Sequence, residues 1–214
     1  MKLNLIKLDK EGLPVFVQVI TAKVKDRGGV DADRQRWEKE LMPGADGFLG
    51  STGGITSDGQ MVLAARFESE EAARRNNDRT EQGEFWSRME SHLDGEASFF
   101  ETSHVSESSG GGSDDAGFVQ VMKGKVNDIE AAERLDARMD KEMPDQRKDV
   151  LGSVTAYKDD GNFYTFIYFT SLEEARRGEK EMTENPPAVM GEWMALMDGE
   201  MTFYDLEEPW LTTK

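Results

Sequence analysis

Cysteine is absent from the 214 residues of this chain, and histidine occurs only twice. The absence of cysteine excludes disulfides, thiolate metal ligands and cysteine nucleophiles. Two histidines give little basis for a catalytic triad. No hydrophobic run approaches the ~20 residues that a membrane-spanning helix needs, and the N-terminus alternates in polarity without the apolar core of a signal peptide. These absences predict a cytoplasmic protein without a metal centre or bound cofactor.

Positive charge is scarce as well. The chain has 43 acidic residues against 26 basic residues, for a net charge of −17. Such a surface repels nucleic-acid phosphates and anionic lipid head groups, so we expect neither nucleic acid nor a membrane as a partner. The acidity is interpreted as a solvated surface, and the other interpretation is a cationic partner or a salt-rich habitat.

The chain does contain an internal repeat, whose two copies are offset by 102 residues. Phe-Val-Gln-Val at 16–19 recurs at 118–121, and Leu-Gly-Ser at 49–51 recurs at 151–153. A further block that begins at Phe67 keeps the same register, and an insertion of two residues precedes the last shared block. Chance does not hold one register across separate blocks. The sequence therefore predicts a tandem duplication.

The repeat also predicts the organisation of the chain. Serine and glycine dominate the stretch between the copies, a composition typical of a flexible tether. The predicted segments are an N-terminal extension (1–13), a first copy (14–103), a Ser/Gly/Asp linker (104–115), a second copy (116–206) and a tail (207–214).

Within each copy the predicted order of elements is β-α-β-β-α-β. Asp-Gly pairs at 58–59 and 160–161 are typical of hairpin turns. Ser69 stands where a helix N-cap belongs, and Asn127 followed by Glu130 has the spacing of a capping box. The second helical region of each copy is long enough to contain a break. This order predicts an α+β fold of the ferredoxin-like, split βαβ type.

The helices of such a unit cover only one face of its sheet. The predicted strands are nevertheless apolar on both faces, since residues 61–65 carry apolar side chains at every position and residues 163–169 are apolar or aromatic almost throughout. The face without helices must therefore be buried, and the second copy on the same chain is the available cover. We predict two ferredoxin-like units packed sheet to sheet as an intramolecular pseudo-dimer, with further oligomerisation left open.

This pattern resembles the dimeric α/β-barrel superfamily, and within it the antibiotic-biosynthesis-monooxygenase-like group. The resemblance rests on the opening Phe-Val-Gln-Val strands, the hairpins and the strand-to-helix junctions at 67–72 and 169–174, and it covers nearly all of both copies. It implies a tandem dimeric α/β barrel with a pocket between sheet and helices. The superfamily includes cofactor-free monooxygenases, haem-degrading enzymes, isomerases and proteins with no established activity, so the resemblance does not determine the function.

A candidate ligand site follows from strand alternation. If one enclosure collects the polar side chains of the opening and third strands, it contains amides, a guanidinium and phenols within aromatic walls, which is typical of a small-molecule site. The alternative is that the two glutamines hydrogen-bond to each other and that Arg66 pairs with Glu101. The predicted members are Gln18, Gln120, Arg66, Tyr164 and Tyr168.

The two copies differ most at residues 76–86, which are polar and then abruptly aromatic. Their counterpart at 183–188 shares almost none of this composition. One diverged copy predicts that any chemistry lies in one half of the chain. Asn77 and Arg79 are candidate ligand-binding residues from this stretch, and Trp86 is expected in the core.

Neither histidine indicates a metal or haem site. His92 lies where haem-degrading relatives carry a haem-ligating histidine, but their first-strand asparagine is replaced here by Gln18, and no tryptophan stands on the third strand. The resemblance to haem proteins therefore does not extend to their site. His104 is expected in a loop, and no His/Asp/Glu cluster has the spacing of metal ligands.

The leading hypothesis is a protein that binds a small, apolar or aromatic organic molecule. If it is catalytic, it resembles the cofactor-independent monooxygenases, with Arg66 stabilising negative charge and Gln18 and Tyr168 orienting the ligand. The alternative is a non-catalytic ligand-binding or interaction module whose interior is a filled core. An open pocket of roughly several hundred Å3, reached by Arg66, would favour the ligand site.

Overall fold

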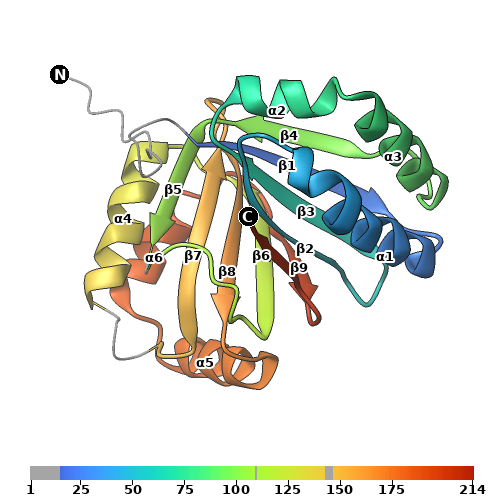
Figure 1. The fold of residues 1–214 in the computed structure, drawn as a ribbon. Coiled ribbons are helices and arrows are strands. Elements are labelled where there is room, and N and C mark those ends of the chain that lie inside the picture. Colours follow the sequence, from blue (N-terminus) through green and yellow to red (C-terminus); the bar gives the residue numbers. More distant parts are fainter. Residues whose placement is uncertain (1–14, 109, 143–146) are drawn as a thin grey trace. The chain divides into compact units, whose positions relative to one another are not determined.

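The computed structural model (Figure 1) divides into two compact units, each with its own sheet and helices. The first unit contains residues 15–103 together with Trp210–Lys214, and the second unit contains His104–Pro209. The predicted N-terminal extension, residues 1–13, lies outside the described residues. The residues that the structure describes are 15–108, 110–142 and 147–214.

The first unit follows the predicted order of elements and adds two short helical turns after its first helix. One of these turns, η1, is a π-helix, and the other, η2, is a 3-10 helix. The elements are β1 (Phe16–Lys23), α1 (Arg27–Arg36), η1 (Trp37–Leu41), η2 (Met42–Gly44), β2 (Phe48–Ile55), β3 (Gln60–Phe67), α2 (Glu70–Asn77), α3 (Thr80–Ser91), β4 (Ser98–Thr102) and, from the end of the chain, β10 (Trp210–Thr213).

The second unit repeats this order. Its second helical region is also broken, between α5 and α6. The elements are β5 (His104–Ser108), β6 (Phe118–Lys125), α4 (Ile129–Glu142), β7 (Val150–Tyr157), β8 (Asn162–Phe169), α5 (Leu172–Glu184), α6 (Ala188–Met194) and β9 (Thr202–Leu206).

Each sheet has five antiparallel strands. Their orders are β10-β2-β3-β1-β4 in the first unit and β5-β7-β8-β6-β9 in the second. In the first unit Gln18 of β1 lies opposite Ala65 of β3 and Glu101 of β4. In the second unit Gln120 of β6 lies opposite Ile167 of β8. The central strands of the two sheets thus keep the same register.

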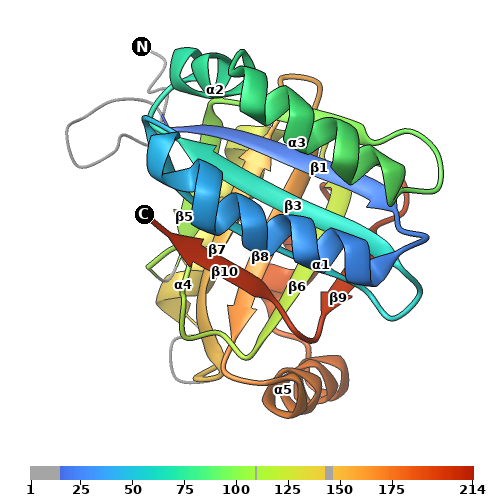
Figure 2. The same cartoon turned by 45° about the vertical axis from the view of Figure 1, so that its right-hand side comes forward.

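The fifth strand of each sheet comes from the segment that follows the other repeat. β5 follows β4 in the chain but pairs with β7, where Val105 lies opposite Ala156. β10 follows β9 but pairs with β2, where Leu211 lies opposite Thr52, and Figure 2 shows it along the edge of the first sheet. The sequence predicts a linker and a tail for these segments, whereas the structure places a strand in each. Each added strand covers an edge that would otherwise expose unpaired backbone groups.

Helices begin at the same repeat positions in both units. The Asp26 carboxylate accepts the backbone N–H three residues on, at 3.0 Å, and the equivalent Asp128 does the same at 2.9 Å. Ser69 and Ser171 cap α2 and α5 in the same way, as the sequence predicts for Ser69. The predicted capping box at Asn127 is wrong by one residue, because Asp128 provides the cap.

The hairpin turns depend on glycine. Gly59 and Gly161 have φ angles of 84° and 86°, a conformation that residues with a Cβ atom rarely adopt. A Cβ atom on Gly161 would also lie 2.1 Å from the carbonyl oxygen of Val126. The Asp-Gly pairs are therefore turn residues, as predicted.

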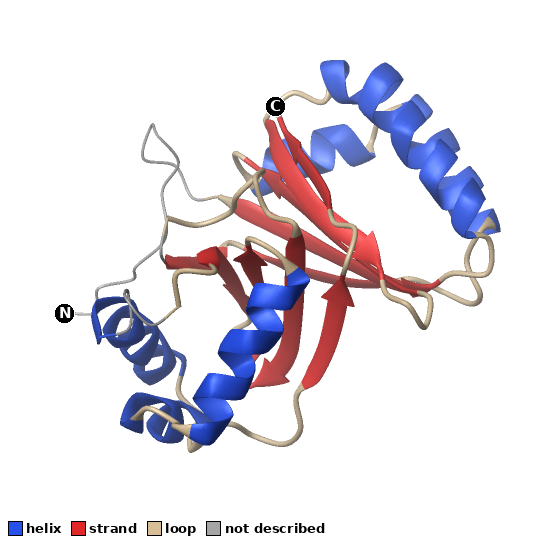
Figure 3. Ribbon diagram, turned by 90° about the horizontal axis from the view of Figure 1, so that it is seen from below, coloured by secondary structure: helices blue, strands red, loops and turns tan. Residues whose placement is uncertain are grey.

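Helices cover a single face of each sheet (Figure 3). In the first unit Phe16 packs with Ala72 and Ala73 of α2. In the second unit Phe118 packs with Ala175 of α5. Since side chains alternate along a strand, Gln18 and Gln120, two residues further along, face the helices as well.

The predicted α+β class and the two tandem ferredoxin-like units are confirmed. The break in the second helical region falls at Asp78 and Arg79 in the first unit and at 185–187 in the second. The predicted packing of one sheet on the other stays a prediction.

Candidate functional site

Each unit contains a hollow between its helices and the face of the sheet that they cover. In the first unit it is a cavity of about 90 Å3, here called the first-unit cavity. In the second unit it is an open cleft of about 1110 Å3, here called the second-unit cleft. All residues that line a hollow belong to the same unit as the hollow. The two units therefore place a hollow at the same position but leave very different room in it.

The difference in size follows from the side chains at equivalent repeat positions. Trp37 lines the first-unit cavity, and Met139 stands at its repeat position in the second-unit cleft. Phe48 corresponds in the same way to Val150. Each exchange replaces a broad ring with a smaller or more flexible side chain, which leaves space in the second unit.

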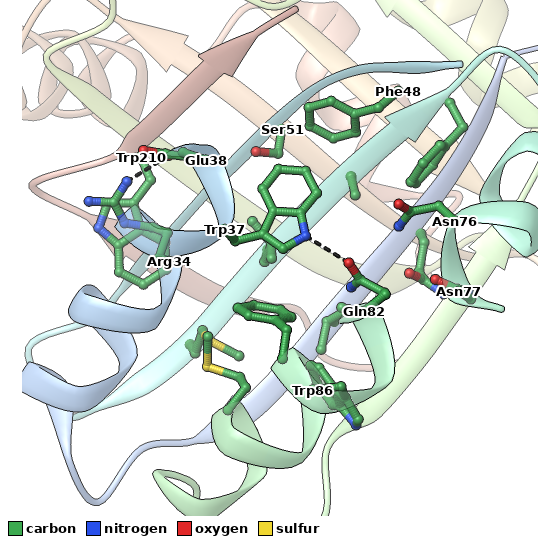
Figure 4. Close-up of a pocket in the computed structure, with 18 residues that line it drawn as sticks. Arg34, Trp37, Glu38, Phe48, Ser51, Asn76, Asn77, Gln82, Trp86 and Trp210 are labelled. Carbon is green, nitrogen blue, oxygen red and sulfur yellow. Dashed lines mark hydrogen bonds and ion pairs between the residues drawn. The ribbon is translucent and has the colours of Figure 1, made fainter. Parts of the chain in front are cut away.

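The Trp37 indole stands in the middle of the first-unit cavity (Figure 4). Its Nε1 donates to Gln82 Oε1 at 2.8 Å, and its ring packs edge-on against Phe48 with 5.0 Å between centroids. Trp210 of β10 lines the same cavity, and the guanidinium of Arg34 lies over its ring at 5.1 Å. Aromatic rings therefore make up a large part of the wall, six of its 18 residues.

Apart from the exposed Asn77, three amide side chains line this cavity, from Gln18, Asn76 and Gln82. Gln18 Nε2 donates to Glu101 Oε1 at 2.5 Å. Asn76 is 4% exposed, and its Oδ1 accepts from Arg79 Nη1 at 3.1 Å. Each amide is thus held by a partner in the protein. The first-unit cavity combines aromatic walls with oriented polar groups.

Methionine dominates the second-unit cleft. Unbranched thioether side chains adapt to ligands of different shape and make favourable contacts with aromatic rings. Ile167, Trp193 and Phe203 add rigid apolar surface to the same walls. These walls suit a flat, apolar ligand. Half of the 12 methionines of the chain line the cleft: Met122, Met139, Met182, Met190, Met194 and Met201.

The polar floor of the cleft is built around Gln120. Its Nε2 donates to Glu179 Oε1 and to Asp205 Oδ1, both at 3.1 Å. Arg176 forms ion pairs with the same two carboxylates. At Gln120 Oε1, no partner occurs among the residues that the structure describes. The floor therefore presents the Gln120 amide oxygen to the cleft. Beside it, the positive charge of Arg176 neutralises part of the negative charge of the two carboxylates.

An acid–base cluster around the buried Tyr157 reaches one wall of the cleft through Asp136. Tyr157 is 1% exposed and its hydroxyl donates to Asp136 Oδ2 at 3.4 Å, where Asp136 lines the cleft. His104 Nε2 lies 2.9 Å from Glu133 Oε1 beside them. Burial raises the pKa of the Tyr157 phenol above its ordinary value, and the neighbouring Asp136 and Glu133 carboxylates raise it further. Tyr157 is therefore a neutral hydrogen-bond donor.

The raised pKa of Tyr157 predicts a loss of stability at alkaline pH. The folded chain keeps this proton while the unfolded chain loses it above a pH of ~10, so stability falls as the pH rises through that range. The loss is at most about 1.4 kcal/mol per pH unit. Tyr157→Phe removes the group and should flatten the decline in urea midpoint between about pH 9 and about pH 11. An equal decline in both proteins would contradict the assignment.

The predicted site residues divide between the two faces of the sheets. Gln18 and Gln120 face the helices and line the two hollows. Arg66 lies opposite Val17, one position away from the pair of Gln18 and Ala65, so it points to the other face. Tyr164 and Tyr168 alternate with Thr165 and Ile167, which line the cleft, and therefore also point away from it. The structure does not bring these five residues into one enclosure.

Of the two candidates from the diverged stretch, Asn77 lines the first-unit cavity and is exposed. Arg79 does not line it but joins the end of η1 to α2, donating to the Leu41 carbonyl oxygen and to Asn76 at 3.1 Å each. Asn76, the buried amide, was missed by sequence reasoning. Its spacing from Ala72 on the covered face of α2 is the signal that could have identified it.

Trp86 and the two histidines also differ in part from expectation. Trp86 is half-buried at the first-unit cavity, and its Nε1 donates to Glu90 Oε1 at 2.8 Å. His92 Nδ1 lies 3.0 Å from Asp26 Oδ2, and its Nε2 lies 3.3 Å from Asp33 Oδ2, so it joins α1 to the end of α3. His104 lies in β5, not in the predicted loop.

Within the described part of the chain, no cluster of three or more His, Asp or Glu side chains has the geometry to hold a metal ion. Among the same residues, no helix has the length and apolar character needed to cross a membrane.

Comparisons with known proteins support the fold but give no close relative. No family model matches the sequence, and no curated protein matches it either. Solved structures do match over both units. A protein from Fusobacterium nucleatum that is provisionally named a monooxygenase has a TM-score of 0.70 at 10% identity, over 94% of this chain and 95% of that one.

Two further structures match to a similar extent. A provisionally named monooxygenase from Lactobacillus acidophilus has a TM-score of 0.68 at 12% identity, over 94% of this chain and 96% of that one. A protein named anthrone oxidase-like has a TM-score of 0.66 at 8% identity, over 94% and 92% of the two chains. At such low identity the likeness shows the fold alone. The chain shares the fold of these three proteins, over both of its ferredoxin-like units.

Proposed function

We propose that this protein binds a small, flat, apolar or aromatic organic molecule in the second-unit cleft and oxidises it without a cofactor. The observation that carries the proposal is the cleft of about 1110 Å3, in which methionine and aromatic walls meet polar side chains around Gln120 and Asp136. Pockets for organic ligands commonly have volumes of roughly 300–1,000 Å3 and this kind of lining. The first-unit cavity is too small to serve the same molecule.

The reaction class follows from the fold and from the composition of the cleft. In cofactor-independent oxygenation the substrate supplies the electrons, and the pocket supplies orientation and exclusion of water. A substrate methylene becomes a carbonyl, with one oxygen atom of O2 entering the product and the other leaving with the two hydrogens as water. The provisional names of two structural neighbours and the anthrone oxidase-like name of a third agree with this class.

Three residues of the second unit have roles in this proposal. Asp136 is the carboxylate on the cleft wall that accepts a proton from the substrate, and the buried Tyr157 hydroxyl orients it. Gln120 contributes its amide oxygen to orient the ligand from the floor of the cleft. Arg66, the residue that the sequence suggests for charge stabilisation, points away from the helix-covered face and has no role here.

Binding can be tested with anthrone under anaerobic conditions. Trp193 is the single tryptophan between His104 and Pro209 and lines the cleft, so bound anthrone should quench its fluorescence. Trp193→Phe should remove the quenching, whereas Trp37→Phe in the first unit should retain it. Quenching that depends on Trp37 would place the ligand in the wrong unit.

A cleft-filling variant extends this test. Ile167→Trp places an additional ring in the cleft and should weaken anthrone binding at least about tenfold, which corresponds to about 1.4 kcal/mol. Asp159→Trp adds the same ring at an exposed turn and should leave binding unchanged. Admission of oxygen should then yield anthraquinone with the unmodified protein, and Asp136→Asn should slow it. Binding without anthraquinone formation would support the non-catalytic binding module instead.

A further inference from the structure

The first-unit cavity raises a separate question, because its polar groups exceed what a filled core requires. Gln18 and Asn76 are 8% and 4% exposed, and Gln82 is half-buried. All three line one cavity, and they come from β1, α2 and α3. Burying an amide without partners for its polar atoms costs free energy. The atoms that these amides leave unpaired therefore indicate what the cavity holds.

The chemistry of their partners fixes the orientation of all three amides. The Trp37 indole and the Arg79 guanidinium can only donate, so Gln82 Oε1 and Asn76 Oδ1 must be the atoms that accept from them. The Glu101 carboxylate accepts, so Gln18 must donate through Nε2. The usual ambiguity between amide oxygen and nitrogen is removed at each position.

Two donors and one acceptor remain. Gln82 Nε2, Asn76 Nδ2 and Gln18 Oε1 have no hydrogen-bond partner among the residues that the structure describes. In Figure 4 Gln82 and Asn76 lie on the side of the Trp37 indole that carries its ring nitrogen. Two N–H donors that line one cavity suit a carbonyl oxygen, which has two lone pairs, and the glutamine oxygen suits an N–H group.

The size of the cavity and its surroundings limit the ligand further. A volume of about 90 Å3 is below the ~150 Å3 of an engineered cavity that takes up benzene, so the ligand has at most one small ring. The Arg34 guanidinium is paired with Glu38 at 2.7 Å, and Glu101 lies behind Gln18. Among the described residues that line the cavity, no positive charge is therefore free to bind an anion at these amides. The walls favour a neutral, planar molecule.

We infer that the first-unit cavity is a second binding site, for a compact neutral carbonyl compound with an adjacent N–H group, such as a lactam or a simple carboxamide. Its carbonyl oxygen accepts from Asn76 and Gln82, and its N–H donates to Gln18. The aromatic rings of Trp37, Phe85 and Trp86 surround its apolar part. This site is distinct from the second-unit cleft in position, size and ligand class.

The test uses 2-pyrrolidinone as the probe and cyclopentane as a probe of similar size without polar atoms. Binding is followed by NMR, through the side-chain NH2 signals of Asn76 and Gln82 in the full-length chain. We expect saturable shifts of these signals with 2-pyrrolidinone and at least about tenfold weaker binding of cyclopentane. Cyclopentanone, which keeps the carbonyl but lacks the N–H, should fall between them.

Two variants separate the site from the fold. Gln82→Glu and Asn76→Asp keep an oxygen for Trp37 and Arg79 but remove the NH2 groups, so each should weaken 2-pyrrolidinone binding at least about tenfold. Gln35→Glu adds the same charge at an exposed position of α1 that does not line the cavity, and it should have little effect. Hydrogen-exchange protection along β2 and β3 should be unchanged in all three, which verifies that the first unit is folded.

Either of two results overturns the inference. One is binding of 2-pyrrolidinone by Gln82→Glu and Asn76→Asp that equals binding by the unmodified chain. The other is the absence of any saturable shift of the amide signals, which would mean that the cavity takes up water only.

Discussion

Removal of Trp210–Lys214 should destabilise the first unit and spare the second, although these residues follow the second repeat in the chain. β10 pairs with β2 over four residue pairs, from Trp210 opposite Gly53 to Thr213 opposite Gly50. Its loss turns β2 into an open edge and removes the Trp210 ring from the wall of the first-unit cavity. We expect a loss of about 2–5 kcal/mol, as for other truncations of large side chains.

The measurement must report on each unit by itself. Hydrogen exchange followed by mass spectrometry should show faster exchange along β2 and β3 in the shortened chain, with β7 and β8 unchanged. Glu208→Ala, an exposed change just before β10, is the control and should leave both units as they were. Equal loss of protection in both units would mean that β10 does not belong to the first.

The sequence predicted most of the two units because their signals are local or repeated. Phe16 and Phe118 occupy equivalent buried positions, and Gly59 and Gly161 occupy equivalent turns. Alternation along strands and turn chemistry depend on neighbouring residues, and the duplication presents each signal twice. Comparison of the copies can therefore correct a prediction made from one of them. Asp26 and Asp128 stand at the same repeat position, which favours Asp128 over Asn127 as the cap.

The exchange of fifth strands could not be predicted in the same way. β5 has five residues and β10 has four, and each pairs with a strand far away in the sequence. Segments this short have too few positions to establish an alternating pattern. The Ser/Gly stretch next to β5 resembles a tether, and β10 stands at the end of the chain, so the sequence favoured a linker and a tail.

The candidate site was predicted in part, and the error has one physical cause. The sequence places Gln18 on one face with Phe16, and Gln120 on one face with Phe118, but it does not specify which face the helices cover; in the structure both glutamines face the helices. The face of Arg66 depends on the register of β3 against β1, and a shift by one residue moves a side chain to the opposite face. Gln18 lies opposite Ala65, so Arg66 points away. The sequence alone does not specify that register.

The unequal volumes of the two hollows follow from differences between the two copies of the repeat. Trp37 and Met139 differ at one repeat position, and Phe48 and Val150 differ at another. Together, these exchanges leave more space in the hollow of the second unit than in that of the first. Divergence between copies thus locates the larger site better than the polar residues that the copies share.

Replacement of Phe163 by alanine should have the largest effect of any single substitution considered. Phe163 is 1% exposed, and its ring lies 5.9 Å from both Tyr157 and Trp193, measured between centroids. The lost burial and the resulting cavity should destabilise the second unit by about 3–5 kcal/mol, measured by urea denaturation. Because Trp193 and the Tyr157–Asp136 pair both depend on this ring, anthrone binding should weaken as well.

A matched exposed phenylalanine separates burial from residue type. Phe99→Ala in β4 removes a ring that is 48% exposed and lies against the Trp86 ring at 5.4 Å, so the cost should be about 1 kcal/mol or less. Comparable losses for the two variants would mean that Phe163 is not a core residue. If Phe163→Ala is strongly destabilised but binds anthrone with unchanged affinity when still folded, the walls of the second-unit cleft do not depend on this ring, and the ligand does not bind against Trp193.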